Sequence, residues 1–360
     1  MSTPRTGRRA RLYEDWPGNE EFFCNGRVVT GPGWQASIGT SVLIAAPSGV
    51  WIGLVMVRLL DEMDTAPGVV LLVLAVLWPL WCIGLLLKTA FTDPGIIPRR
   101  SEPDEEFART GKHTKRVPYN GKEVEVRYNE TCKFYQPPRA HHCSVTNDCI
   151  ERFDHYCPWV GTTIGLRNYR TFFAFILSTA GLLIYVIVTS ALLLDYRFQD
   201  LKDNDTPDDK ATVLDAIADE PATIALIIFC FLCLIFVGAL SCFHAYLVAT
   251  NQTTYENFRY DYAVGANPYD RGCCGNCYEV WLQRIPPAQA DFRAFVDEVE
   301  STRQRVNGSS HGEGDVEMGS VHESGFSTPQ GVSYDNMTPS SSSAKLAGAS
   351  ASGKVRSVQP

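Results

Sequence analysis

The sequence predicts an all-α integral membrane protein with four transmembrane helices and a cytosolic, cysteine-rich loop domain between the second and third helices. Three observations support this fold class. The apolar residues gather in four charge-free blocks, basic residues flank one of the connecting loops, and that same loop carries a dense group of cysteines and histidines. Single-domain soluble folds are excluded, because such blocks are typical of membrane spans.

The four blocks are long enough to cross a bilayer. They lie at about residues 36–57, 68–87, 171–194 and 221–249. A helix rises 1.5 Å per residue and the hydrocarbon core is about 30 Å thick, so each block of about 20 residues or more can span it. This placement divides the chain into an N-terminal segment 1–35, two helices within 36–91, a cysteine-rich domain 92–170, two helices within 171–249, a segment 250–300 that packs on the membrane domain, and a disordered tail 301–360.

Charge sets the predicted orientation. Arginines lie close to both membrane boundaries of the loop 92–170: Arg99, Arg100, Arg167 and Arg170. The loop 195–220 instead holds nine acidic and three basic side chains. Because positively charged flanks stay in the cytosol, we expect 92–170 and both termini to be cytosolic and 195–220 to be lumenal. The net charge of −8 argues against a nucleic-acid partner, which needs a basic face to meet phosphate.

The cytosolic loop contains four cysteines and three histidines between Cys132 and Cys157. Disulfides are rare in the reducing cytosol, so metal binding or thiol chemistry explains this density better. The alternative is that the cysteines are small buried residues, but a loop of such polar composition offers little core to bury them.

Within this loop, the run Asp154-His155-Tyr156-Cys157 has the composition of a nucleophile with its base. A thiol with an ordinary pKa of about 8.5 is mostly protonated at neutral pH, so a nucleophilic cysteine needs a neighbouring base or cation, which a histidine provides. A carboxylate beside that histidine can fix its tautomer and stabilise the imidazolium. On residue types alone, a zinc site of cysteines and histidines fits about equally well.

Several segments around this run form a wider pattern: Gln136-Pro137-Pro138-Arg139, His142-Cys143-Ser144, Arg152-Phe153-Asp154-His155, Cys157-Pro158-Trp159-Val160-Gly161, Asp93-Pro94-Gly95, Thr253-Thr254-Tyr255-Glu256 and Asn267-Pro268-Tyr269. Together they resemble the DHHC protein S-acyltransferases over about residues 13–282. The resemblance implies that Asp154, His155 and Cys157 are catalytic, because they occupy the catalytic positions of that family.

The chain departs from the family pattern at four positions. Tyr156 stands where the family has the second histidine of its signature, which therefore reads DHYC here. Asn129, Thr146 and Thr163 stand where the family has cysteines that bind zinc. These changes fall on the zinc ligands and leave the catalytic positions intact.

Carried over position by position, one of the two family zinc sites keeps three ligands, Cys132, His142 and Cys149, and the other keeps Cys143 alone. Structural zinc is almost always four-coordinate, so a single thiolate is no basis for a site. The resemblance therefore implies about one zinc ion per chain. Asn129, His141 or water could complete the first site, although each binds more weakly than a thiolate.

Other residues also receive expected roles. Thr253, Thr254 and Glu256 follow the fourth block and are expected to hold the acid–base pair, while Asn276 is expected to tie the C-terminal segment to the membrane domain. Four arginines are candidates to bind the phosphates of acyl-CoA, although a positive-inside flank explains each equally well: Arg139, Arg152, Arg167 and Arg170. Juxtamembrane cysteines are frequent S-acylation sites, which predicts modification of Cys273, Cys274 and Cys277.

The resemblance implies an enzyme that transfers palmitate from palmitoyl-CoA to cysteines of cytosolic or membrane-associated proteins, through an acyl thioester on Cys157. The alternative is a catalytically silent membrane adaptor, which would not need Asp154, His155 and Cys157. A transporter is a weaker alternative, because no block carries an acidic or basic residue at its centre. The expected partners are acyl-CoA, membrane lipid and substrate proteins, and the expected location is the Golgi, the ER or the plasma membrane.

Overall fold

The structure is a computed structural model that describes residues 9–63, 65–119, 121–204, 210–259, 262 and 267–297. The predicted disordered tail 301–360 lies outside these residues. Among the described residues, four helices are long and apolar enough to cross a membrane, which confirms the prediction of four spans. The first comprises α1 (Gln35–Trp51), a π-helical turn (Ile52–Met56) and α2 (Val57–Glu62); the others are α3 (Thr65–Ala90), α5 (Tyr169–Asp203) and α7 (Pro221–Ala249).

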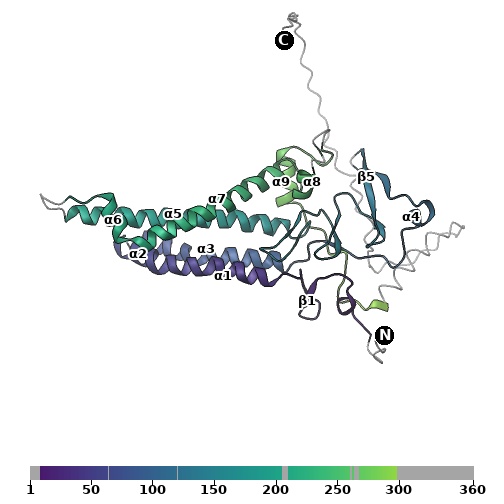
Figure 1. Cartoon of the computed structure of the whole chain (residues 1–360), viewed down its shortest axis with the longest axis horizontal. Helices are drawn as coiled ribbons and strands as arrows, with labels where there is room; N and C mark the ends of the chain where they lie inside the picture. Colours follow the sequence, from purple (N-terminus) through teal and green to yellow (C-terminus); the bar gives the residue numbers. More distant parts are fainter. Residues whose placement is uncertain are drawn as a thin grey trace, which may run out of the picture. The chain divides into compact units, whose positions relative to one another are not determined.

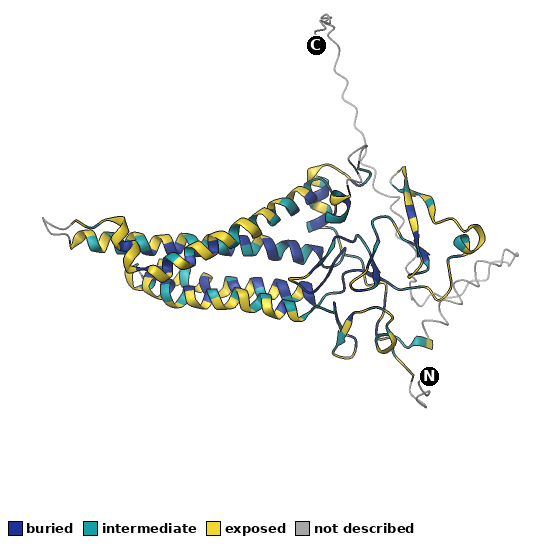
Figure 2. Cartoon of the chain, in the orientation of Figure 1, coloured by how far each residue is buried: buried dark blue, intermediate teal, exposed yellow. Residues whose placement is uncertain are grey.

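In the helical bundle, α5 lies along both α3 and α7, and α1 lies along α3 (Figure 1). Three aromatic rings meet inside it. Tyr185 of α5 stacks on Trp78 of α3 with ring centroids 5.6 Å apart, and Trp51 of α1 meets Tyr185 edge-on at 5.3 Å. The outward faces of the helices are exposed (Figure 2), and many of the exposed residues are large and apolar, among them Leu80, Ile235 and Phe236. Exposed apolar surface of this extent is unfavourable in water and fits contact with lipid.

The predicted acidic loop 195–220 is largely helical, which corrects its expected structure. The helix α5 continues to Asp203, and α6 (Val213–Asp219) packs against it before α7 begins at Pro221. The change of composition at Asp195 marks the end of the apolar block and not the end of the helix. Residues 195–203 contain no Gly or Pro, so nothing in that stretch interrupts the backbone hydrogen bonds.

The region between α3 and α5 contains antiparallel strands, so the prediction of an all-α fold is wrong there. The strands are β3 (Ile96–Ile97), β4 (Thr114–Tyr119), β5 (Lys122–Asn129), β6 (Phe134–Tyr135), β7 (His141–Cys143), β8 (Asp148–Ile150), β9 (His155–Cys157) and β10 (Thr162–Ile164), with the short helix α4 (Glu105–Thr110) before β4. They form two three-stranded sheets, β3-β8-β7 and β4-β5-β6, and the hairpin β9-β10. Strands of two or three residues are too short to leave an alternating hydrophobic pattern.

Segments from both ends of the chain pack on this β-rich region. The short elements η1 (Leu12–Asp15), β1 (Glu21–Phe23) and β2 (Val28–Thr30) precede α1, and α8 (Thr254–Phe258) and α9 (Cys273–Trp281) follow α7. The Tyr13 amide donates to the Phe292 carbonyl oxygen at 2.9 Å, which joins the two segments. The helix α9 packs against α7, so the C-terminal segment also reaches the bundle.

Candidate active site and metal centre

The strand β9 explains how Asp154-His155-Tyr156-Cys157 is divided between two surfaces. Successive side chains of a strand point to opposite faces, so His155 and Cys157 share one face and Tyr156 lies on the other. Pairing with β10 fixes this arrangement, with Cys157 opposite Thr162 and Tyr156 opposite Thr163. The hairpin turns at Gly161, whose φ of 80° suits glycine, and a side chain there would collide with the backbone of Gly33.

Asp154 and His155 form a buried, hydrogen-bonded pair. His155 Nδ1 lies 2.7 Å from Asp154 Oδ2, and the Asp154 side chain is almost fully buried. Burial alone would raise the pKa of Asp154, but the hydrogen bond and charge of His155 outweigh burial and hold the pKa below its usual range. Burial likewise opposes charge on His155, yet its hydrogen bonds to Asp154 and Cys157 raise its pKa to about 10. The geometry therefore stabilises an imidazolium between a carboxylate and a thiol.

Cys157 is buried at the edge of an apolar cluster that continues into the bundle. Its neighbours in this cluster include Leu86 of α3, Phe172 of α5 and Val248 of α7. A nucleophile in this position has its base on one side and hydrocarbon-like surroundings on the other. Such a site suits a reaction at one end of a long apolar substrate.

Helix α8 supplies the remaining partners of Asp154. Its first residue, Thr254, donates from the backbone nitrogen to Asp154 Oδ1 at 2.9 Å and from the hydroxyl to Oδ2 at 2.7 Å. The preceding Thr253 caps the helix together with Glu256, whose carboxylate accepts from the Thr253 amide at 2.8 Å. The structure thus brings Thr253, Thr254 and Glu256 together behind the acid–base pair, where the sequence analysis expects them.

Arg139 connects α8 to the turn before β7. Its guanidinium donates to both carboxylate oxygens of Glu256, at 2.7 and 2.8 Å, and both side chains are buried. Burial opposes charge on Glu256, but the Arg139 charge outweighs it and lowers the pKa of Glu256. Arg139 also lies over the Tyr269 ring, with its guanidinium carbon 4.4 Å from the ring centroid. Arg139 therefore holds α8, and with it Thr254, in place beside Asp154.

Sequence reasoning missed Asn251 as a structural centre. Its side-chain oxygen accepts from Arg139 and Arg152, each at 2.9 Å, and its nitrogen donates to Tyr269 and Glu279. The residue lies just beyond the end of α7 with φ of 46°. An Asn in the left-handed region directly after a helix is a common helix end, so the sequence held a signal for its backbone but none for its partners.

The four arginines expected near phosphate are all engaged with the protein. Arg152 pairs with Glu279 at 3.0 Å, Arg167 pairs with Asp93 at 3.2 Å, and Arg170 donates to the carbonyl oxygens of Val280 and Gln283 at 2.6 Å. Arg139 is buried against Glu256. These contacts favour a structural role, and phosphate binding by these arginines stays a prediction.

Asn276 is fully buried in α9 and donates hydrogen bonds to the last residue of α7 and to the segment just before α9. Its amide nitrogen donates to the Ala249 carbonyl oxygen at 2.8 Å and to Asp270 at 2.7 Å. On the same helix, Cys273 and Cys274 are exposed, while Cys277 is half-buried. The expected tie between Asn276 and the end of the fourth helix is thus present in the geometry.

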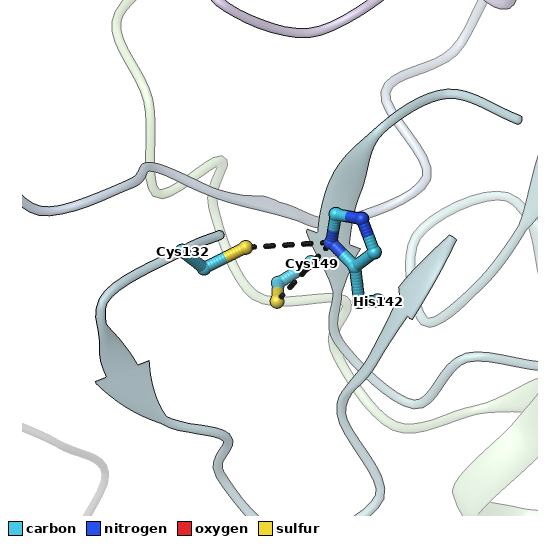
Figure 3. Close-up of side chains that lie close together, drawn as sticks. All are labelled: Cys132, His142 and Cys149. Atoms are coloured by element: carbon cyan, nitrogen blue, oxygen red, sulfur yellow. Dashed lines mark hydrogen bonds between the residues drawn. The ribbon is translucent and has the colours of Figure 1, made fainter. Parts of the chain in front are cut away.

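Three predicted metal ligands lie close together (Figure 3). The donor atoms of Cys132, His142 and Cys149 are all within 4.8 Å of one another, with His142 Nδ1 3.5 Å from Cys132 Sγ and 3.9 Å from Cys149 Sγ. Tetrahedral zinc with ordinary bond lengths places sulfur and nitrogen ligands about 3.6 Å apart. The three residues therefore fit one zinc ion, which would clamp the turn after β5 to the β7-β8 hairpin.

Neither protein candidate for the fourth ligand points clearly at this site. Asn129 uses its side-chain oxygen to accept from the Cys132 amide at 2.8 Å. His141 precedes His142 in β7, so it faces the other way, and its ring lies 4.0 Å from that of Tyr255. These contacts leave water as the simplest fourth ligand.

The residues at the expected second zinc site contact one another. Thr163 donates to Cys143 Sγ at 3.2 Å and lies 3.3 Å from the Thr146 hydroxyl, and all three side chains are buried. Tyr156 of β9 packs against Cys143 and its apolar neighbours. The set offers one sulfur ligand and three hydroxyls, so it does not fit zinc, and hydrogen bonds and packing hold these segments together.

Comparison with known proteins agrees with this geometry. Residues 122–261 match the model of the DHHC palmitoyltransferase family. The chain is 40% identical over 298 residues to Probable protein S-acyltransferase 6 of Arabidopsis thaliana, covering 79% of this chain and 71% of that protein. It is 41% identical over 300 residues to Probable protein S-acyltransferase 7 of the same plant, covering 79% of this chain and 66% of that protein. It is 40% identical over 309 residues to Protein S-acyltransferase 8, covering 80% of this chain and 73% of that protein.

The ligand geometry predicts one zinc ion per purified chain, measured by elemental analysis. Cys132→Ser should remove most of this zinc, because two protein ligands cannot hold it well. Cys143→Ser is the matched control and should leave the zinc content unchanged. Two zinc ions per chain would contradict the replacement of the second site, and a metal-free wild type would contradict the first.

The Arg139–Glu256 pair predicts an asymmetric response to mutation. Arg139→Met leaves the buried carboxylate unpaired and should lower the free energy of unfolding by about 3–5 kcal/mol. The double variant Arg139→Met/Glu256→Leu should be more stable than Arg139→Met, because it removes both charges. Arg100→Met, which breaks an exposed pair with Asp104, should cost about 1 kcal/mol or less and serves as the control. Equal losses for Arg139→Met and Arg100→Met in denaturant or thermal unfolding would contradict this.

Proposed function

The chain belongs to the DHHC palmitoyltransferase family, and we propose that it is a protein S-acyltransferase that transfers palmitate from palmitoyl-CoA to protein cysteines through a thioester on Cys157. The observation that carries this proposal is the hydrogen-bonded pair of Asp154 and His155 beside Cys157, at the edge of the apolar cluster. The names of the curated relatives, which are all S-acyltransferases, support the same reaction class.

In the first half-reaction, His155 takes the proton of Cys157, and the thiolate attacks the carbonyl carbon of palmitoyl-CoA. The bond to the CoA sulfur breaks, and the leaving CoA thiolate takes the proton from His155. Asp154 holds Nδ1 of the ring, so Nε2 is the atom that exchanges this proton. The raised pKa of His155 favours its imidazolium form, which is the form that proton transfer from Cys157 produces.

In the second half-reaction, neutral His155 removes the proton from the thiol of a substrate protein. The new thiolate attacks the acyl group, and Cys157 leaves as a thiolate beside the reprotonated His155. The enzyme returns to its starting state, so one histidine serves both steps. Zinc held by Cys132, His142 and Cys149 would supply only a structural cross-link between the hairpins that support this strand.

The proposed orientation puts the catalytic region and both termini in the cytosol, with the enzyme in the Golgi, the ER or the plasma membrane. Palmitoyl-CoA then approaches from the cytosol, and its tail enters the bundle from the lipid side. The exposed Cys273 and Cys274 lie on α9 and are proposed sites of S-acylation on the enzyme itself.

A silent adaptor is less consistent with the buried contacts. Asp154 has two hydrogen bonds from Thr254 and one with His155, although it lies in a region where a neutral side chain would be easier to bury. An adaptor gains nothing from a buried carboxylate that stabilises an imidazolium. Tyr156 points away from this pair and does not interrupt it.

The proposal predicts that Cys157→Ser abolishes transfer of a clickable palmitoyl group to substrate protein and that His155→Ala reduces it strongly. The hydroxylamine-sensitive label on the enzyme should fall in parallel, apart from residual label on Cys273 or Cys274. Tyr156→His, which restores the family residue, should not be needed for activity. Undiminished transfer by Cys157→Ser would exclude Cys157 as the nucleophile.

The aromatic centre of the bundle predicts where the acyl chain ends. An extended sixteen-carbon chain reaches about 20 Å, which equals the rise of about 13 helical residues. Counted from Thr171, this depth falls near Gly181, Leu182 and Tyr185. A Cβ atom at Gly181 would lie 2.8 Å from the Trp78 ring, so a larger residue there must displace that ring.

We therefore expect Gly181→Phe to shift preference from sixteen-carbon toward fourteen-carbon acyl-CoA in a competition assay, because overpacking costs about 1–3 kcal/mol. Leu182→Ala should shift the preference toward eighteen carbons. Leu177→Phe, on an exposed face of the same helix, is the control and should leave the preference unchanged. Unchanged selectivity in active Gly181→Phe and Leu182→Ala would place the end of the pocket elsewhere.

A further inference from the structure

His244 is a buried polar residue that the proposed reaction does not use. It lies near the end of α7, a helix of 29 residues that contains no Asp, Glu, Lys or Arg, and its side chain is about 1% exposed. An imidazole in such surroundings loses its hydration and needs a hydrogen bond in return. A phenylalanine would fill similar space without this cost, so packing alone does not account for a histidine.

One hydrogen bond holds the His244 ring. Its Nδ1 lies 3.1 Å from the hydroxyl of Tyr169, the first residue of α5. Phe172, one turn further along α5, meets the His244 ring edge-on with centroids 5.1 Å apart. The bond between Tyr169 and His244 thus fixes the beginning of α5 against the end of α7.

The rings of Phe172 and His244 also lie beside His155 of the proposed catalytic pair. The His155 ring lies 5.3 Å from the Phe172 ring and 6.1 Å from the His244 ring, measured between centroids. On its other sides, His155 is bonded to Asp154 and Cys157. Hydrogen bonds therefore hold the ring of His155, and two rings from separate helices lie beside it.

We propose that His244, fixed by Tyr169, is a positioning residue that keeps the His155 ring in the orientation in which Nδ1 faces Asp154 and Nε2 faces Cys157. The inference rests on the proposed function, because it assigns His244 a role in forming the acyl-enzyme. Loss of this hydrogen bond leaves the His244 ring free to move, so the His155 ring can rotate and its short hydrogen bond to Asp154 weakens. His155 then holds its proton less tightly.

The surroundings of His155 set the expected change with pH. Among the described residues, the titratable groups around it are Asp154, which precedes its strand, Cys157 from the same strand, His244 from α7 and Tyr169 from α5. Arg139 and Arg152 act on Tyr169 from the adjacent turns. Because Asp154 and Cys157 raise the pKa of His155 to about 10, its imidazolium is present below that pH and lost above it. A weaker bond to Asp154 moves this loss to lower pH.

The experiment measures acyl-enzyme formation and CoA release from palmitoyl-CoA between pH 6 and 10, in full-length His244→Phe, Tyr169→Phe and the double variant. Each single change should slow the reaction about threefold to tenfold at pH 7.5 and shift the alkaline decline to lower pH. The double variant should be no slower than the singles, because all three remove the same interaction. His244→Asn, which restores a hydrogen-bonding atom near Nδ1 but packs less well, should be faster than His244→Phe.

Tyr246→Phe, an exposed position two residues further along α7, is the matched control and should behave as wild type. Three results would each overturn the role of His244. They are wild-type rates in both single variants, additive losses of rate in the double variant, and a slower reaction whose pH profile is unchanged. A wild-type protein that forms no thioester would instead overturn the proposed function, and the inference with it.

Discussion

Arg139 and Glu256 form a buried ion pair on which the strand with the proposed catalytic residues depends, because the ion pair joins the two parts of the chain that meet at Asp154. Both guanidinium contacts are short, and both side chains are nearly excluded from water. Breaking such a pair leaves a buried charge without compensation, so the two residues dock as a unit. Docking brings Thr254 to Asp154, and Asn251 adds Arg152 and Glu279 to the same network. The pair of Asp154 and His155 is therefore held in place by this buried network.

The alternation of β9 separates the expected second zinc site from the proposed catalytic residues. Tyr156 points to the cluster of Cys143, Thr146 and Thr163, while His155 and Cys157 point to the opposite surface. Buried hydroxyl contacts among Thr146, Thr163 and Cys143 can take over a purely structural task, because they cross-link the same segments. No replacement of this kind exists for the thiol–imidazole chemistry. Zinc ligands on one face could thus change without disturbing the catalytic face.

Much of this could be predicted from the sequence. Hydropathy placed the four long apolar helices, and the family resemblance implied a shared metal site at Cys132, His142 and Cys149 that the geometry accommodates. The family match confirms the resemblance. The short strands could not be predicted, because two or three residues are too few to show an alternating hydrophobic pattern. The predicted end of the third helix was wrong, because the sequence becomes polar at Asp195 while the helix continues to Asp203. The roles of Arg139, Asn251 and His244 depend on partners about 70 to 120 positions away in the chain, which no local pattern records.

These long-range contacts make the chemistry conditional on complete folding. A three-residue strand has little stability of its own, so β9 is ordered by its pairing with β10, by the rings of Phe172 and His244 against His155, and by the hydrogen bonds of Thr254 to the preceding Asp154. Without the two donors of Thr254, the carboxylate of buried Asp154 would lose two of its hydrogen bonds and would stabilise the imidazolium less well. The complete set of contacts around the pair can exist only after the fourth helix has formed and α8 has docked. In a chain that has not reached this stage, Cys157 lacks an ordered base, and we expect the thiol to react slowly with acyl thioesters.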